Sequence, residues 1–231
     1  MVDQIISEIP DAAVMYLINA LTFEAQWKTI YRNDQIGDAN FIKEDGTIQN
    51  ISWMYSTESW FLSDENASGL IKYYADGKYA FAALVPDEGI RMADYVASLT
   101  GERLHSILSG AEQAQVIAAI PKFFCQYDTE LTDALKGMGM TDRFDPAQAD
   151  LTPGIGTSQT GPLYVNQVLH KTFLTVDEAG TKAGAATAVA VSDRGTMPDY
   201  RAYLNRPFDY MLIDCQANVP IFIGALMDAD T

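Results

Sequence analysis

The side chains that could carry out catalysis are few in this 231-residue chain, and they are scattered. The only histidines are His105 and His170, and no serine or cysteine stands in a nucleophile motif. The two cysteines, Cys125 and Cys215, are too few for a disulfide framework, and the sequence leaves open whether they pair. This pattern argues against a hydrolase. The protein is therefore not expected to be an enzyme, and its function is expected in a loop and a conformational change.

Metal binding is not expected either. Asp142, Asp145 and Asp150 could suggest a calcium loop, but their spacing does not match the calcium-loop pattern and the closing Glu is missing. His105 has no Cys or His nearby, so we interpret it as a surface or packing residue. The sequence predicts no metal site and no cofactor.

The chain between residues 173 and 191 changes from a strand pattern to a run of very small side chains. Phe173–Asp177 is β-branched and half apolar, as strands are. Beyond it, one alternate row is Thr181, Ala183, Ala185, Thr187, Val189 and Val191, and the other is Lys182, Gly184, Ala186, Ala188 and Ala190. In an extended strand the first row could lie on a core, while the second, with the only charge, faces outward. Such side chains could enter an existing sheet without displacing their neighbours.

A simpler interpretation of this segment is a flexible Gly/Ala linker or a frayed helix. Alanine favours a helix, whereas the two glycines, two threonines and two valines in the run weaken that interpretation. Composition alone favours the linker or frayed helix, and the flanking sequences change that judgement.

Composition and charge exclude several classes of protein. The chain is 48% hydrophobic and 20% charged, as ordinary soluble domains are. Its net charge of −16 argues against a nucleic-acid partner, because phosphate binding requires clustered Lys and Arg. No apolar run reaches about 18 residues, so no membrane span is predicted. No signal peptide is predicted at Met1, so we expect the protein to be intracellular or its start to have been removed or lost.

Periodicity predicts an α+β protein. Ala12–Phe23 is a nearly continuous apolar run with one buried-looking amide, Asn19, and it fits a strand covered on both faces or a buried helix. The other expected elements are hairpins over 41–54 and 70–86, two short helices within 92–108, a strand over 116–125, a helix from Asp128 or Thr129 to Gly137 or Gly139, and strands over 206–214 and 219–226.

Several stretches resemble one family. Glu178-Ala-Gly-Thr-Lys-Ala-Gly-Ala-Ala-Thr187 resembles the hinge of the serpins, the suicide inhibitors of serine proteases, and Val168-Leu-His-Lys-Thr-Phe-Leu-Thr-Val-Asp-Glu178 resembles the strand that leads into it. Asn19-Ala-Leu-Thr-Phe-Glu-Ala-Gln-Trp27 resembles a serpin strand, and the openings Pro121-Lys-Phe and Arg206-Pro-Phe follow in family order. The resemblance covers about Pro10 to Met227.

The resemblance implies a fold of serpin-like mixed β-sheets with surrounding helices. Residues 1–231 would be the C-terminal part of one serpin domain, with a reactive loop at about 178–203. Because complete serpins have more chain before the strand at Ala12, we expect the domain to be N-terminally incomplete. A missing N-terminal segment of the same domain is then a possible partner.

The resemblance also implies a mechanism. The polar, turn-rich stretch Ser192–Pro198 would be bait for a trypsin-like serine protease, with the reactive bond at Arg194–Gly195 and Arg201 as a weaker alternative. After cleavage, with the protease held as an acyl complex, the hinge would insert into the large sheet. The hinge residues are Glu178, Gly180, Thr181, Ala183, Gly184, Ala185, Ala186 and Thr187. The polar contacts of the opening sheet are Asn19 with His170, Lys122 with Glu178, and Trp27.

Three interpretations therefore compete. The first, which we prefer, is an inhibitory serpin or the part of one that carries its reactive loop, acting outside the cell as family habit implies. The second is a non-inhibitory or inactive truncated serpin-like protein that is only a protease substrate or a binding domain. The third is an unrelated α+β enzyme, which would require a convergent polar site that the sequence does not contain. Outside the family context, Arg194 is simply a surface charge.

Overall fold

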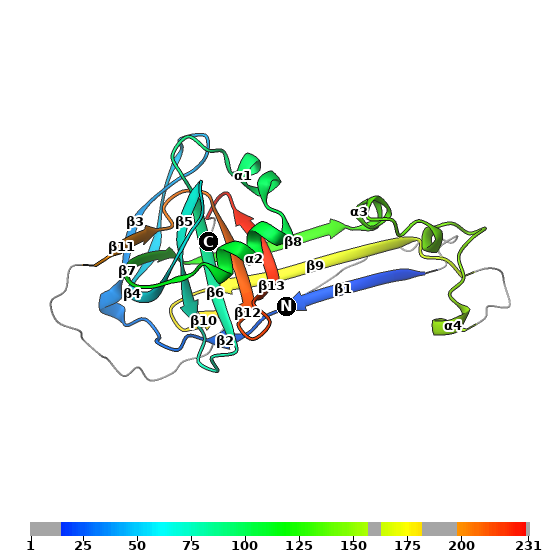
Figure 1. Ribbon diagram of the computed structural model, residues 1–231, viewed down its shortest axis with the longest axis horizontal. Coiled ribbons are helices and arrows are strands. Elements are labelled where there is room, and N and C mark those ends of the chain that lie inside the picture. Colours follow the sequence, from blue (N-terminus) through cyan, green and yellow to red (C-terminus); the bar gives the residue numbers. More distant parts are fainter. Residues whose placement is uncertain (1–14, 157–162, 182–197, 230–231) are drawn as a thin grey trace. The chain divides into compact units, whose positions relative to one another are not determined.

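The computed structural model describes residues 15–156, 163–181 and 198–229 (Figure 1). The chain divides into two compact units, Met1–Thr22 with Cys125–Leu174, and Phe23–Phe124 with Thr175–Thr231. No helix in the described ranges is long and apolar enough to cross a membrane. Cys125 and Cys215 are both free thiols.

The first unit is built on a pair of parallel strands. β1 (Tyr16–Thr22) pairs along β9 (Gln167–Val176), with Tyr16 opposite Gln167 and Thr22 opposite Phe173, and Figure 1 shows the two side by side. β8 (Phe123–Glu130) also pairs with β9. Alternate residues of β9 are buried, namely Val168, Thr172, Leu174 and Val176, as expected for a strand with one face on a core.

Two sequence expectations for this unit are wrong. Asn19 is exposed and not buried, like Leu17 and Ile18 beside it, and β9 is the only described strand that pairs with β1. The expected helix start at Asp128 lies inside β8, and the helix α3 (Thr132–Gly137) begins later. A 3-10 turn, η2 (Asp142–Phe144), and a short helix, α4 (Thr152–Ile155), follow it.

The second unit contains an eight-stranded sheet. Its strands are β3 (Ile36–Ile42), β4 (Ile48–Ser63), β5 (Ala67–Tyr73), β6 (Tyr79–Pro86), β7 (Glu112–Pro121), β11 (Tyr200–Tyr203), β12 (Phe208–Asp214) and β13 (Val219–Leu226). The order is β11-β7-β4-β5-β6-β12-β13, with β3 also on β4. The hairpins β3–β4 and β5–β6 and the two final strands confirm the sequence predictions. The expected strand over 116–125 is instead the end of β7 and the start of β8, separated by Lys122, whose N–H donates to Ser52 O.

Two helices pack on one face of this sheet. α1 (Met92–Ser98) and α2 (Gly101–Ser109) confirm the prediction of two short helices, and the side chain of Thr100 caps the second by accepting from Arg103 N–H. Among the strands of this sheet, α1 contacts β12 and α2 contacts β4. The core between them contains Leu62, Ala67, Ile71, Ala80, Ala82, Leu84, Met92, Tyr95, Ile107, Leu108, Met211 and Ile213.

Three short elements complete the second unit. β2 (Ala25–Gln26) follows Phe23 and Glu24, η1 (Asn33–Gln35) lies before β3, and β10 (Gly180–Thr181) follows β9 after a turn. β10 pairs antiparallel with both β2 and the end of β9. The start of the expected hinge is thus held on both sides by sheet pairing.

Candidate functional site at the start of the hinge

The turn from β9 into β10 is closed by one carboxylate. Asp177 Oδ1 accepts from the N–H groups of Ala179 and Gly180, at 2.8 and 3.1 Å. The N–H of Asp177 donates to Gly180 O at 2.9 Å. A short acidic side chain favours this geometry because it reaches backbone donors two and three residues ahead. The chain therefore reverses direction after Asp177 and presents Thr181 antiparallel to β9.

Thr181 is fully buried at the end of this turn. It lies opposite Val176 in β9 and opposite Ala25 in β2. Its Oγ1 is 2.6 Å from the hydroxyl of Tyr74, which is also fully buried. Burial raises the pKa of the Tyr74 phenol, so its hydroxyl stays neutral and can donate or accept.

Gly180 lies where no larger residue fits. A Cβ at this position would be 2.1 Å from Ala25 O, which belongs to the backbone of β2. No rotamer change could relieve that contact, because both partners are main chain. The close approach of β2 and β10 therefore requires glycine here.

Trp27 holds the hinge backbone at two points. Its Nε1 donates to Asp177 O at 2.8 Å, and its backbone N–H donates to Ala179 O at 2.9 Å. The indole is 1% exposed and stacks on the Tyr74 ring, with centroids 4.6 Å apart and planes 7° from parallel. Trp27 thus positions both the turn and the phenol that bonds to Thr181.

The expected ion pair between Lys122 and Glu178 is present. Lys122 Nζ is 2.6 Å from Glu178 Oε2, and the side chains are 26% and 45% exposed. The hydrogen bond from Lys122 lowers the pKa of the Glu178 carboxyl. The carbonyl of Glu178 accepts from Tyr31 N–H at 3.0 Å. The pair is partly exposed to solvent, so it contributes little to stability. It holds the Glu178 side chain on the side of the turn that faces Lys122.

A buried charged cluster, which sequence reasoning missed, lies behind Trp27. Lys72 is 3% exposed in its side chain and pairs with Glu58 at 2.6 Å. Its Nζ lies 4.4 Å from the ring centre of Tyr31 and 5.4 Å from that of Trp27. Burial disfavours the charged ammonium, but Tyr31 and Glu58 more than offset it, and the pKa of Lys72 is raised. The sequence signal for this cluster was Lys72 itself, the one charged residue in the mostly apolar strand β5.

The expected contact between Asn19 and His170 is not formed. The two residues are opposite each other in the β1–β9 register. However, His170 Nδ1 is buried without a hydrogen-bond partner among the described residues, and Asn19 is exposed.

The rest of the expected hinge and the reactive bond lie outside the described residues, namely Ala183, Gly184, Ala185, Ala186, Thr187, Arg194 and Gly195. The weaker candidate, Arg201, is exposed and lies in β11, opposite Ile117 of β7. A protease requires an extended, unpaired segment, so sheet pairing makes Arg201 a poor substrate residue.

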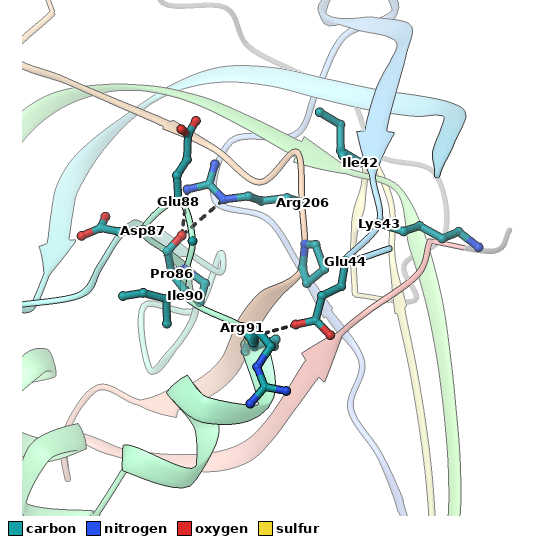
Figure 2. Close-up of a pocket in the computed structure, with 12 residues that line it drawn as sticks. Ile42, Lys43, Glu44, Pro86, Asp87, Glu88, Ile90, Arg91 and Arg206 are labelled. Atoms are coloured by element: carbon teal, nitrogen blue, oxygen red, sulfur yellow. Dashed lines mark hydrogen bonds between the residues drawn. The ribbon is translucent and has the colours of Figure 1, made fainter. Parts of the chain in front are cut away.

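Figure 2 shows a pocket of about 270 Å³ between the end of β3, the loop from β6 to α1, and Arg206 with Pro207. Two of its polar side chains form hydrogen bonds to backbone groups. The Arg206 guanidinium donates to Pro86 O at 2.7 and 3.3 Å, and Glu44 accepts from Met92 N–H at 2.8 Å. No three His, Cys, Asp or Glu side chains in the described ranges gather in a way that could hold a metal ion.

Comparison with known proteins places the chain in a family. The sequence model of Serpin (serine protease inhibitor) matches residues 1–229. Human Serpin B12 is 29% identical over 220 residues, which cover 91% of this chain and 54% of that protein. Human Antithrombin-III is 30% identical over 220 residues, which cover 94% of this chain and 47% of that protein. The chain belongs to the serpin family, and it spans about half the length of these relatives.

Solved structures agree on the fold. The crystal structure of a thermophilic serpin, Tengpin, in the native state superposes with a TM-score of 0.91 at 40% identity, covering 99% of this chain and 59% of that one. The same protein in the latent state gives a TM-score of 0.75 at 38% identity, covering 90% and 55%. Human thyroxine-binding globulin, at 21% identity, shares the fold alone. The predicted α+β serpin fold is confirmed.

Proposed function

We propose that this chain carries the reactive loop of an inhibitory serpin, which acts as a suicide substrate of trypsin-like serine proteases. One observation carries the proposal: Thr181, the first residue of the small-side-chain row, already pairs antiparallel with Val176 of β9. The following residues could continue that pairing down β9 once the loop is cut. An extracellular place of action belongs to the same proposal and follows family habit.

The strand pairing supports one path for the entering segment. β1 pairs directly with β9, but β2, which follows β1 after two residues, is separated from β9 by β10. Gly180 and Thr181 thus stand between β9 and the continuation of β1. A segment that extends β10 along β9 would separate β9 from β1 and take the place between them.

The register then defines the pairs that would form. Continuing from Thr181 opposite Val176, the new pairs are Ala183 with Leu174, Ala185 with Thr172, Thr187 with His170 and Val189 with Val168. Residues opposite each other in antiparallel strands point to the same face. The partners at 168, 172 and 174 in β9 are buried. The row from Thr181 to Val191 would therefore be buried, while Lys182 and its row would face outward.

The chemical steps belong to the protease until the loop inserts. Its serine oxygen attacks the carbonyl carbon of Arg194, and the bond from that carbon to the nitrogen of Gly195 breaks. The protease's histidine takes the proton of the serine hydroxyl and gives it to the leaving amine of Gly195. Arg194 stays attached as an ester. Insertion beside β9 adds ladder hydrogen bonds and buries the small row, so it competes with hydrolysis of the ester.

Resemblance to the native form supports a loop that is not yet inserted. The chain matches native Tengpin with a higher TM-score than latent Tengpin, 0.91 against 0.75. β1 and β9 are also paired over seven residues in the described structure, with no strand between them.

The test is to mix the chain with trypsin and to separate the products on a denaturing gel. A covalent band is expected at the mass of trypsin plus residues 1–194, with the fragment that starts at Gly195 released. Thr181→Arg should abolish the band, because it places a charge on the buried row. Lys182→Arg, its neighbour on the outward row, should keep it.

Cleavage after Arg194 without a covalent band would reject the inhibitor proposal. The loop would then be only a protease substrate on a serpin scaffold, the second interpretation of the sequence. A cut elsewhere in the loop, mapped by mass spectrometry, would reject Arg194–Gly195 as the reactive bond.

A further inference from the structure

We propose that Tyr74 is a positioning residue for loop insertion, whose hydroxyl bond to Thr181 keeps the first rung of the entering strand formed before the loop is cut. This inference rests on the proposed function and adds a residue that the family resemblance did not suggest. The inference requires that residues outside the hinge hold the Tyr74 ring in place. It also requires that the hydroxyls of Tyr74 and Thr181 have no other hydrogen-bond partner to exchange for each other.

The Tyr74 ring is fixed by its surroundings. It stacks on Trp27 at 4.6 Å and lies 5.1 Å from the tilted ring of Phe23. The main chain is fixed as well, because Tyr74 and Trp27 form an isolated antiparallel bridge and Tyr74 N–H donates to Tyr79 O at 3.1 Å. The ring therefore cannot turn away without breaking the core around it, and the phenol oxygen is held at one place.

Burial makes the hydrogen bond between the Thr181 hydroxyl and the phenol oxygen costly to break. Both residues are 0% exposed, so neither hydroxyl can exchange its partner for water while the hinge is docked. Removing one partner leaves the other buried and unpaired, which costs more than the bond itself contributes. The Tyr74–Thr181 bond thus stabilises the docked hinge, in which both hydroxyls are hydrogen-bonded, relative to the undocked hinge.

The docked state matters for insertion because Thr181 keeps its position. In the proposed register the new pairs begin beyond Thr181, so the Tyr74–Thr181 bond is present before and after insertion. Insertion can then grow from a formed rung, without first closing a loop onto the sheet. When the hinge is undocked, the acyl ester has more time to hydrolyse.

The experiment measures hinge docking by amide hydrogen exchange in the uncleaved chain. Tyr74→Phe keeps the ring and removes only the hydroxyl, and Thr181→Val removes the other hydroxyl at nearly constant shape. Each should speed exchange of the amides at 177–181 by about fivefold to tenfold. The double variant should be no faster than the faster single variant, because both changes remove the same bond.

Tyr95→Phe is the matched control. It removes another buried tyrosine hydroxyl bond, to Asp64 at 3.2 Å, in the same unit and without contact to the hinge. It should leave exchange at 177–181 unchanged. If Tyr74→Phe leaves that exchange unchanged, or if Tyr95→Phe speeds it equally, the positioning role is wrong.

A second readout connects the bond to inhibition. With trypsin, Tyr74→Phe should shift products from the covalent band toward cleaved, free chain, and a shift the other way would overturn the inference. If the unaltered chain forms no covalent band, the proposed function fails, while the exchange data still decide whether the bond docks the hinge.

Discussion

A buried carboxyl in the second unit should make the stability of the fold depend on pH. Asp209 is 1% exposed, and its Oδ2 has no hydrogen-bond partner among the described residues. It lies in β12 opposite Leu84 of β6 and Ala225 of β13, two residues before Met211, which belongs to the core under α1 and α2. Asp209→Asn keeps the shape and removes the charge.

The magnitude follows from the pKa of this group. Burial raises the pKa of Asp209 from its ordinary value of 3.8 to about 7. The titratable group that interacts with Asp209 is Tyr95 of α1, which stays neutral over this range because burial and Asp64 raise the pKa of its phenol. A shift of this size corresponds to about 4 kcal/mol at about 1.36 kcal/mol per pKa unit. Between pH 4 and 7 the folded chain holds a proton that the unfolded chain has lost, so stability falls as pH rises through that window.

The assay is urea unfolding of the unaltered chain and of Asp209→Asn at a series of pH values from 5 to 8.5. The variant should be more stable by about 4 kcal/mol at pH 8, and the difference should shrink to under about 2 kcal/mol at pH 5. Asp38→Asn, which removes an exposed carboxylate from a strand of the same sheet, is the matched control. A difference between Asp209→Asn and the unaltered chain that is constant over this range would refute the reasoning.

Three further predictions concern the hinge and the cluster behind it. Gly180→Ala should lower the free energy of unfolding by about 1–3 kcal/mol and speed exchange at 177–181, because its Cβ would lie 2.1 Å from a backbone oxygen of β2; unchanged exchange would contradict the close approach. Glu178→Gln should cost less than about 1 kcal/mol at pH 7, because the pair with Lys122 is partly exposed, and the loss should vanish as acid protonates the carboxyl; urea unfolding at pH 7 and pH 3 tests this. Lys72→Met should cost about 3–5 kcal/mol in thermal unfolding because it leaves Glu58 buried and unpaired, and adding Glu58→Leu should recover most of that loss; no recovery would reject the buried pair as the cause.

The local parts of the fold could be predicted because their signals are short in sequence. The hairpins were predicted over 41–54 and 70–86, and each contains an Asp-Gly pair, Asp45-Gly46 and Asp76-Gly77, where the chain turns. Gly46 and Gly77 indeed have φ of +84° and +68°, which only glycine adopts readily. The start of the hinge was predicted from its resemblance to the serpin hinge, and the structure shows Gly180 against β2 and Thr181 beside β9.

What could not be predicted depends on pairing between distant strands. Tyr74 and Thr181 are 107 residues apart, and nothing in either local sequence indicates that their hydroxyls meet. Asp209 lies in a strand that was predicted correctly, but its unpaired burial depends on β6, β13 and α1 together. The error at Asn19 has the same origin, because an apolar run shows that a strand is present and not which neighbours cover it.

The most direct test of the central claim is the stability of the fold before and after a single cut at Arg194–Gly195. Mass spectrometry identifies the cut chain, and urea unfolding compares it with the intact one. If residues 182–191 enter beside β9, the cut chain gains a strand and should unfold at a higher urea concentration, and Thr181→Arg should prevent the gain. A cut chain that unfolds at the same or a lower urea concentration would contradict loop insertion.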